Sequence, residues 1–230
     1  MKFGVIVYPG SNCDDDMLYL LGKELGQDVE RLWHKDKDLK QCDFLILPGG
    51  FAYGDYLRAG AVARFSPIME SVIDHAKAGG FVYGICNGFQ ILCESHLLPG
   101  VLLKNSTRKY ICKNVFLRAE TKDSLLTRAM ETLKPYQIPI AHGEGRFFVD
   151  ETSLRTLNEN DQILFRYCDK NGDINVGSNP NGSLESIAGI CNEMRNVFGM
   201  MPHPERSSST DLGCTDGLVI FESILEKVLV

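Results

Sequence analysis

The sequence lacks a long apolar run, and this absence limits the kinds of protein it can encode. None of its hydrophobic stretches approaches the roughly 20 residues that cross a bilayer. The apolar start at residues 3–8 is too short for a signal peptide, because Asn and Asp interrupt it at residues 12–16. We therefore expect a buried first strand instead of a leader, no membrane partner, and a cytoplasmic chain.

Patterns typical of metal sites and disulfide frameworks are also missing, although the chain has 8 cysteines. No two of them form Cys-x-x-Cys, and no Cys/His cluster has the spacing of a zinc site. Without a secretory context, a disulfide framework is not expected. We predict that most of these thiols are small buried residues and that the chain holds no metal.

Neither the charge nor the glycine pattern indicates a nucleic-acid or nucleotide ligand. The net charge of −6 disfavours nucleic acid as a partner. The glycine-rich segment 48–60 lacks Gly-x-Gly-x-x-Gly and Gly-Lys-Ser/Thr, so no nucleotide site is predicted there. At 230 residues, with no repeat or linker, the chain is predicted to form a single domain spanning 1–230.

The first hundred residues alternate between strand-like and helix-like patterns. Strands are predicted at 3–8, 29–33, 43–47 and 81–85, and helices at 14–25 and 67–78. This alternation predicts an α/β fold with an open, twisted, mostly parallel sheet and helices on both faces. Ligands bind such sheets beyond the carboxyl ends of the strands. The glycines at 48–50 and Cys86 both follow strands, so they can face one another.

The second half of the chain has shorter segments with a different pattern. We expect antiparallel strands that extend or flank the parallel sheet, at 115–119, 138–141, 163–167, 174–176, 187–190 and 197–200. The Lys-Asn-Gly-Asp sequence at 170–173 is typical of a hairpin turn. A last amphipathic helix is predicted at 217–229.

The most informative motif is Gly-Ile-Cys-Asn-Gly at residues 84–88. It follows the apolar strand at 81–85 and precedes an apolar stretch of helical spacing. The spacing parallels the Gly-x-Ser-x-Gly elbow, where glycines relieve the crowding of a strained strand-to-helix turn. A side chain there is exposed at the end of the strand and lies at the positive end of the helix dipole, which favours a thiolate. We predict that Cys86 is a nucleophile.

A thiol nucleophile needs a base, and the base needs an orienting group. His203 lies in Pro-His-Pro-Glu, where the two prolines favour an extended backbone. Two residues apart on such a segment, His203 and Glu205 share a face, so the carboxylate can orient the ring. A rigid turn with a surface salt bridge is the open alternative. His34 and His75 lie in charged stretches and are expected on the surface.

Two glycine-rich segments supply further candidates. The amide of Gly50 can provide half of an oxyanion hole, with the amide of Asn87 as the other half by analogy with the elbow. The segment 142–147 carries a His, a Glu and an Arg between glycines. That pattern is typical of a ligand or partner surface, and a simple turn between two strands is the alternative.

Taken together, these motifs resemble the class I (triad) glutamine amidotransferases. The order and spacing of Pro-Gly-Gly at 48–50, the elbow at 84–88 and Pro-His-Pro-Glu at 202–205 match that family. The longer strings PGGFAYGDYLRAG, IAHGEGRF and MPHPER are similar to the glutaminase subunits of the family that serve purine biosynthesis. The resemblance runs from Phe3 to the final helix. It implies a flavodoxin-like fold and the hydrolysis of L-glutamine to glutamate and ammonia through a thioester.

The resemblance also implies a role for each candidate residue. The nucleophile, the base and its orienting acid are Cys86, His203 and Glu205. The oxyanion donors are the amides of Gly50 and Asn87. The glutamine contacts are Gln90 and the backbone of Asn105 and Ser106. Residues 105–110 depart somewhat from the family pattern Asn-x-Ser-x-Arg-Phe.

Ammonia is useful only where an acceptor waits, so the resemblance implies partners. Family members pair with a large synthetase subunit that uses ATP and Mg²⁺, and in many bacteria a small third subunit joins the complex. No cofactor is expected in this chain. The docking surface is predicted on two exposed glycine-rich loops, 51–60 and 142–147, at Tyr53, Asp55, Arg58, His142, Glu144 and Arg146.

Three alternatives remain open from the sequence. A cysteine hydrolase or stress protein of the flavodoxin-like superfamily shares the elbow but usually lacks Pro-His-Pro-Glu. A non-catalytic binding module is disfavoured by the intact Cys86, His203 and Glu205. An amidotransferase that serves another acceptor, in pyrimidine, GMP or tryptophan synthesis, is disfavoured by the strings at 51–60 and 142–147.

Overall fold

The computed structural model describes residues 1–226. The chain divides into two compact units: unit 1 comprises Met1–Pro99 and Asn196–Gly199, and unit 2 comprises Gly100–Arg195 and Met200–Val230. Each unit has its own hydrogen-bonded strands and its own buried side chains. The end of the last predicted helix, at 227–229, lies outside the described residues.

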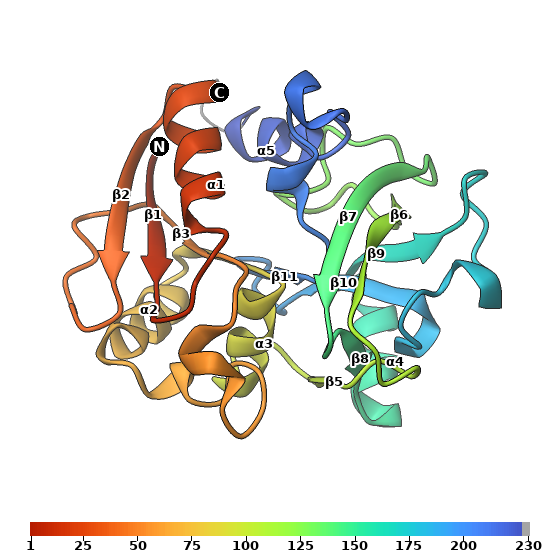
Figure 1. Cartoon of the computed structure of the whole chain (residues 1–230), viewed down its shortest axis with the longest axis horizontal. Coiled ribbons are helices and arrows are strands. Elements are labelled where there is room, and N and C mark those ends of the chain that lie inside the picture. Colours follow the sequence, from red (N-terminus) through yellow and green to blue (C-terminus); the bar gives the residue numbers. More distant parts are fainter. Residues whose placement is uncertain (227–230) are drawn as a thin grey trace. The chain divides into compact units, whose positions relative to one another are not determined.

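Unit 1 contains a mostly parallel sheet with the strand order β2-β1-β3-β4-β11 (Figure 1). β1 pairs in parallel with β2 and with β3, and β3 pairs in parallel with β4. β1, β3 and β4 are almost completely buried, as expected for parallel strands covered on both faces. The strands are β1 (Lys2–Val7), β2 (Asp28–Trp33), β3 (Phe44–Leu47), β4 (Phe81–Ile85) and β11 (Val197–Met200), of which Met200 belongs to unit 2.

Two helices of unit 1 connect these strands, and a third follows β4 (Figure 1). The chain steps from β1 to β2 in one direction across the sheet and from β3 to β4 in the other. Right-handed crossovers therefore place α1 and α2 on opposite faces. The order reverses between β1 and β3, and such a switch point is where sheets of this kind bind ligands. The helices are α1 (Asp14–Tyr19, extended by a π-helical turn at Leu20–Glu24), α2 (Pro67–Lys77) and α3 (Asn87–Glu94).

Unit 2 is built on antiparallel strands in the order β10-β9-β6-β7 (Figure 1). β6 pairs with β7 on one side and with β9 on the other, and β9 pairs with β10. A separate two-stranded ribbon joins β5 to β8. The predicted antiparallel character of this half is confirmed. The strands are β5 (Val101–Leu103), β6 (Ile111–Ala119), β7 (Tyr136–His142), β8 (Arg146–Phe148), β9 (Ile163–Cys168) and β10 (Ile187–Cys191).

One predicted strand of unit 2 is wrong. Residues 174–176 form no strand and lead into a short 3-10 helix, η4 (Val176–Ser178). The carboxylate of Asp169 accepts the amides of Asn171 and Asp173 at 2.8 and 3.1 Å, so the chain closes a local turn there. The turn residues were recognised correctly, but they do not lead into a second strand.

Two helices complete unit 2, and one of them was not predicted. The missed helix α4 (Glu151–Glu159) begins after Asp150, whose carboxylate accepts the amide of Ser153 at 3.0 Å. The last helix, α5 (Leu218–Leu225), was predicted. Within residues 1–226, no helix combines the length and the hydropathy that crossing a membrane requires.

Candidate active site

Cys86 lies on a sharp turn between β4 and α3 in unit 1. Its φ of 51° and ψ of −103° place it in a region that non-glycine residues rarely occupy. A Cβ on Gly88 would lie 1.9 Å from the carbonyl oxygen of Leu47, and one on Gly84 would lie 2.6 Å from the backbone of Gly88. Only glycine fits at both positions. The strand, elbow and helix predicted from the motif are therefore confirmed.

The thiol of Cys86 is less accessible than the motif suggested. The residue is 4% exposed, whereas an exposed side chain was expected. The glycines explain this difference, because they let the end of β3 and the first turn of α3 close tightly around the elbow. A reagent or substrate must therefore reach a largely enclosed sulfur atom.

The loop that carries Gly50 is held by the loop that follows β1. Gly50 has a φ of 151°, and a Cβ there would lie 2.8 Å from the Cα of Ser11. Ser11 and Gly50 form an isolated β-bridge, and the amide of Phe51 donates to the carbonyl of Gly10 at 2.9 Å. Both loops lie at the switch point of the sheet. The backbone around Gly50 is thus fixed at the edge where a site is expected.

Asn87 and Gln90 lie on the first turn of α3, and both are buried. The side-chain amide of Asn87 donates to Oε1 of Gln90 at 2.9 Å. The backbone amide of Gln90 donates to the carbonyl of Cys86 at 3.1 Å. Unit 1 therefore brings a predicted oxyanion donor and a predicted glutamine contact together beside the thiol.

Two residues predicted to face a partner also make contacts within unit 1. The hydroxyl of Tyr53 lies 2.7 Å from Nδ1 of His34 and 2.8 Å from the hydroxyl of Ser66. The guanidinium of Arg58 donates to both carboxylate oxygens of Glu94, at 2.5 and 2.7 Å. His34 is 3% exposed, so its predicted surface position is wrong; aromatic rings pack around it.

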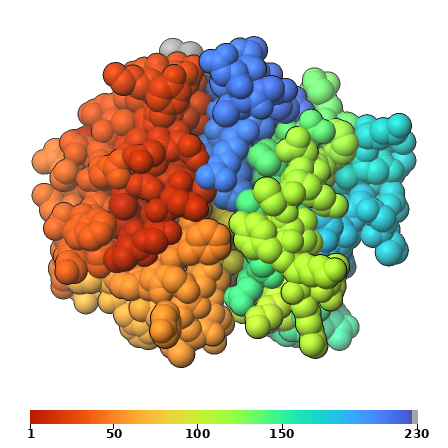
Figure 2. Space-filling model, viewed as in Figure 1, coloured from red at the N-terminus to blue at the C-terminus, as the bar shows by residue number. Residues whose placement is uncertain are grey.

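Large apolar side chains of the same region are also exposed to solvent. Tyr56, Leu57 and Phe65 are 74%, 90% and 73% exposed. In the space-filling view this region, drawn in orange, lies at the surface of the face shown (Figure 2). Large apolar side chains in such numbers on one loop are typical of a contact surface. Of the contact residues predicted on this loop, Arg58 is exposed, and Tyr53 and Asp55 are partly exposed.

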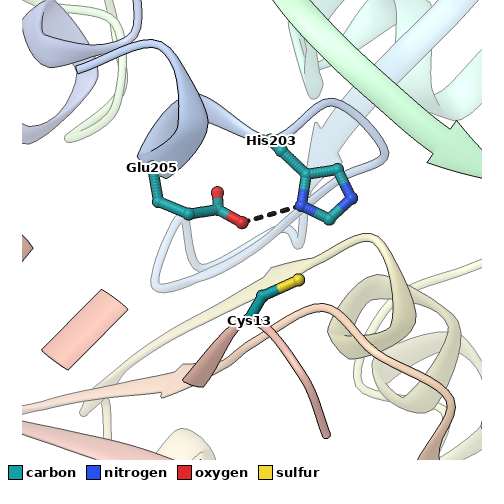
Figure 3. Close-up of side chains that lie close together, drawn as sticks. All are labelled: Cys13, His203 and Glu205. Atoms are coloured by element: carbon teal, nitrogen blue, oxygen red, sulfur yellow. Dashed lines mark hydrogen bonds and ion pairs between the residues drawn. The ribbon is translucent and has the colours of Figure 1, made fainter. Parts of the chain in front are cut away.

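His203 and Glu205 meet in unit 2 (Figure 3). Nδ1 of His203 lies 2.7 Å from Oε1 of Glu205, and both residues are buried. Because a carboxylate only accepts, Nδ1 carries the hydrogen and Nε2 is the basic nitrogen. Glu205 lies in a 3-10 turn, Pro204–Arg206, so the segment is not extended as predicted. The pair is buried, which excludes the surface salt bridge of the alternative interpretation.

His142 is a second buried imidazole of unit 2. Its Nδ1 lies 3.0 Å from Oδ1 of Asn105, which also accepts the amide of Gly145 at 3.1 Å. Burial lowers the pKa of His142 to about 4, and His203 acts in the same direction whenever its ring is protonated. His142 is therefore neutral at physiological pH.

The loop 142–147 is not the exposed surface that was expected. His142 and Gly145 are buried, and Glu144 and Arg146 are only partly exposed. Asn105 explains this arrangement, because its side-chain amide also donates to the carbonyls of Lys109 and His142, each at 2.9 Å. The hydrogen bonds of one buried asparagine therefore hold this loop in place.

The backbone of the predicted glutamine-binding segment is already in use. The amide of Asn105 donates to the carbonyl of Gly143, and the amide of Ser106 donates to the carbonyl of Asn181, both at 2.9 Å. The side chain of Ser106 is exposed and lines a hollow of about 590 Å³ in unit 2. Of the atoms in this segment, the hydroxyl of Ser106 is thus better placed for a ligand than the two amides.

None of the 8 cysteines forms a disulfide. Burial raises the pKa of Cys42, Cys168 and Cys191 to about 11, and raises the pKa of Cys93 well above its usual value. These four thiols remain protonated at neutral pH and act as small apolar side chains. Cys112, by contrast, is exposed on β6.

Comparison with known proteins identifies the family. The model of the CobB/CobQ-like glutamine amidotransferase domain matches residues 1–212. The chain belongs to this family. Two relatives of this amidotransferase are both described as "Phosphoribosylformylglycinamidine synthase subunit PurQ". The one from Koribacter versatilis is 56% identical over 225 residues, covering 98% of this chain and 97% of the relative. The one from Nostoc sp. is 53% identical over 229 residues, covering 100% and 99%.

Solved structures support the fold of this amidotransferase. A chain of the "Structure of PurLQS from Thermotoga maritima" matches with a TM-score of 0.86 and 42% identity, covering 99% of this chain and 98% of the other. Another glutamine amidotransferase from Thermotoga maritima matches with a TM-score of 0.59 and 14% identity, covering 100% and 86%; this likeness concerns the fold alone. The predicted α/β fold, mostly parallel with added antiparallel strands, is confirmed.

Proposed function

We propose that this amidotransferase is the glutaminase subunit of phosphoribosylformylglycinamidine synthase. It hydrolyses L-glutamine to glutamate and delivers the ammonia to a synthetase subunit. That subunit converts formylglycinamide ribonucleotide to formylglycinamidine ribonucleotide in purine biosynthesis, within an ATP-dependent C–N ligase complex. The assignment of the ammonia acceptor rests on the PurQ relatives, which match over nearly the full length. The chemistry rests above all on the strained elbow at Cys86.

The proposed mechanism has two halves. The sulfur of Cys86 attacks the side-chain amide carbon of glutamine, and the thiol proton passes to Nε2 of His203. The amides of Gly50 and Asn87 stabilise the oxyanion of the tetrahedral intermediate. The C–N bond then breaks, and the proton leaves with ammonia. Water hydrolyses the resulting γ-glutamyl thioester, with His203 again accepting a proton, and releases glutamate and the free thiol.

Glu205 and the proposed substrate contacts support this sequence of steps. Glu205 accepts the hydrogen on Nδ1 of His203, which leaves Nε2 as the basic nitrogen for proton transfer. Gln90 and the segment of Asn105 and Ser106 are proposed to bind the glutamine substrate. Because both backbone amides of that segment already donate within unit 2, we assign its contact with glutamine to the hydroxyl of Ser106.

The proposal includes partners and a cellular setting. The large synthetase subunit uses ATP and Mg²⁺, a small third subunit joins the complex, and this chain itself needs no cofactor. Eight cysteines without a disulfide are in keeping with a reducing, cytoplasmic compartment. The family model spans residues of both units, which supports the assignment of 1–230 to a single amidotransferase domain.

A glutaminase assay tests the reaction. Glutamate release is measured for the purified chain alone and with the candidate synthetase subunits. Cys86→Ser, His203→Asn and Glu205→Gln are each expected to lower kcat, and Cys86→Ser to abolish turnover. Cys112→Ser is the matched control, because it removes an exposed thiol of unit 2 that has no assigned role. Turnover that survives Cys86→Ser would exclude the thioester mechanism, and ammonia transfer to a different acceptor would exclude the pathway.

A pull-down with the synthetase subunits tests the docking surface. Residues 51–60 are proposed to contact the partner, and Leu57→Asp places a charge on the most exposed apolar side chain of that loop. We expect weaker assembly with normal glutaminase activity of the free chain. Arg146→Glu examines the second loop in the same way, and unchanged assembly and ammonia transfer would remove residues 142–147 from the proposed surface.

A further inference from the structure

The side chain of Asn87 makes a set of contacts that the proposed reaction does not use. Its Oδ1 accepts the backbone amide of Ala52 at 3.0 Å. Its Nδ2 donates to Oε1 of Gln90 at 2.9 Å and to the carboxylate of Asp55 at 3.3 Å. Ala52 and Asp55 belong to the loop that follows β3, whereas Asn87 directly follows the nucleophile. One buried amide therefore joins the elbow to the oxyanion loop.

The partners fix the orientation of this amide. A backbone amide only donates, so Oδ1 must face Ala52; a carboxylate only accepts, so Nδ2 must face Asp55. Asn87 is 2% exposed, and removal of its side chain would leave the amide of Ala52 without its acceptor. A donor left unsatisfied in this way costs about 1–3 kcal/mol. Asparagine supplies both functions in one short side chain, whereas an ionised aspartate can only accept.

The loop that Asn87 holds has a strained backbone. Tyr53, Gly54 and Asp55 have φ values of 55°, 67° and 54°, three successive residues in the left-handed region. A non-glycine residue in this region persists only where its surroundings hold it there. The bonds from Asn87 to Ala52 and Asp55 are two of the contacts that do so. Gly50, the proposed oxyanion donor, is two residues before Ala52.

We propose that the side chain of Asn87 is a positioning residue that holds the loop of Gly50 in register with the nucleophile elbow. The inference rests on the proposed glutaminase function. The backbone amide of Asn87 is one proposed oxyanion donor, and its side chain positions the loop that carries the other. The distance between the two donors is thus set within a single residue and its hydrogen-bond partners.

Such a role predicts an effect on turnover more than on substrate binding. The oxyanion exists only along the reaction path, so a displaced donor weakens the transition state and leaves the ground state largely unchanged. Loss of one oxyanion donor typically lowers kcat about 100- to 1000-fold. A donor that is displaced but still present should lower kcat by less, about 10- to 100-fold.

Asn87→Asp is the informative substitution. It is nearly isosteric and can still accept the amide of Ala52, but it brings a second carboxylate against Asp55. Asp55→Asn in the same chain restores a donor and an acceptor with their positions exchanged. We expect Asn87→Asp to lower kcat about 10- to 100-fold with a smaller change in KM, and the double variant to recover most of the loss. Asn171→Asp, on an exposed turn of unit 2, controls for the added charge.

Two further measurements separate positioning from misfolding and from loss of the thiol. The Tm of Asn87→Asp reports folding. The rate at which iodoacetamide alkylates Cys86 reports the reactivity of the thiol, because this reaction forms no oxyanion intermediate. We expect an alkylation rate within about threefold of wild type while kcat falls. A kcat that is unchanged in Asn87→Asp, or that Asp55→Asn fails to restore, overturns the positioning role. A wild-type chain that releases no glutamate in any combination of subunits instead overturns the proposed function itself.

Discussion

This protein should lose stability between pH 7 and pH 5, and replacing His142 with asparagine should make that loss smaller. Burial lowers the pKa of His142 from 6.5 to about 4, and His203 adds to this effect whenever its ring is protonated. The same ring titrates near 6.5 in the unfolded chain. Between these two values the unfolded state binds a proton that the folded state does not. The free energy of unfolding therefore falls as the pH falls through this window.

The two pKa values determine the size of the effect. At pH 7 the difference in proton binding lowers the free energy of unfolding by about 0.2 kcal/mol, and at pH 5 by about 2 kcal/mol. Asparagine cannot titrate, but its amide can still donate to Oδ1 of Asn105, which His142 contacts at 3.0 Å. The variant should therefore lose about 2 kcal/mol less than wild type over this range, whatever its stability at pH 7.

Urea unfolding followed by circular dichroism at pH 7, 6 and 5 measures this difference. His34 and His75, whose pKa values burial also lowers, are present in both proteins, so their contributions cancel in the comparison. Equal slopes of stability against pH for wild type and His142→Asn would refute the reasoning, because they would mean that His142 takes up its proton equally in both states.

Three further substitutions test individual contacts by their effect on the free energy of unfolding. Gly88→Ala should destabilise by about 3 kcal/mol or more, because its Cβ would lie 1.9 Å from a carbonyl oxygen. The control Gly79→Ala has no neighbour within 4 Å and should cost only about 1 kcal/mol, from its positive φ. Equal losses in the two variants would contradict the close approach at Gly88. Tyr53→Phe should cost about 1–3 kcal/mol, since it removes two hydrogen bonds from buried partners, and Tyr56→Phe, at 74% exposure, should be neutral in the same thermal melts. Asp150→Ala should cost about 1 kcal/mol through the lost cap of α4, and unchanged urea unfolding would show that this cap contributes nothing.

The parallel strands of unit 1 were predictable because their sequence pattern is local. The strand at 81–85 was predicted with the bounds of β4, since an apolar run between Gly79-Gly80 and the elbow leaves little choice. The strand at 29–33 also matches β2 to within one residue. Helix α4 was missed because it is mostly polar, with Leu157 as its buried residue, so its hydrophobic pattern is too sparse.

The contacts of the candidate site were less predictable, because they join residues far apart in the chain. Cys86, with its flanking glycines, and the His203–Glu205 pair carry local signals that the sequence shows directly. Nothing local indicates that Tyr53 bonds to His34, or that Asn105 ties down the loop at 142–147. The exposure of a loop depends on such distant contacts. The catalytic roles of the three residues remain predictions.

The burial of most thiols affects how the protein can be labelled chemically. At pH 8, a thiol with a pKa of about 11 is ionised in roughly one molecule in a thousand, so Cys42, Cys168 and Cys191 hardly react with electrophiles. Cys93 is even less reactive. A chain with 8 sulfhydryl groups therefore presents few that a reagent can modify. The exposed Cys112 would be the main thiol to compete with Cys86 for an electrophile shaped like glutamine. Cys112→Ser would therefore provide a cleaner background for titrating active sites.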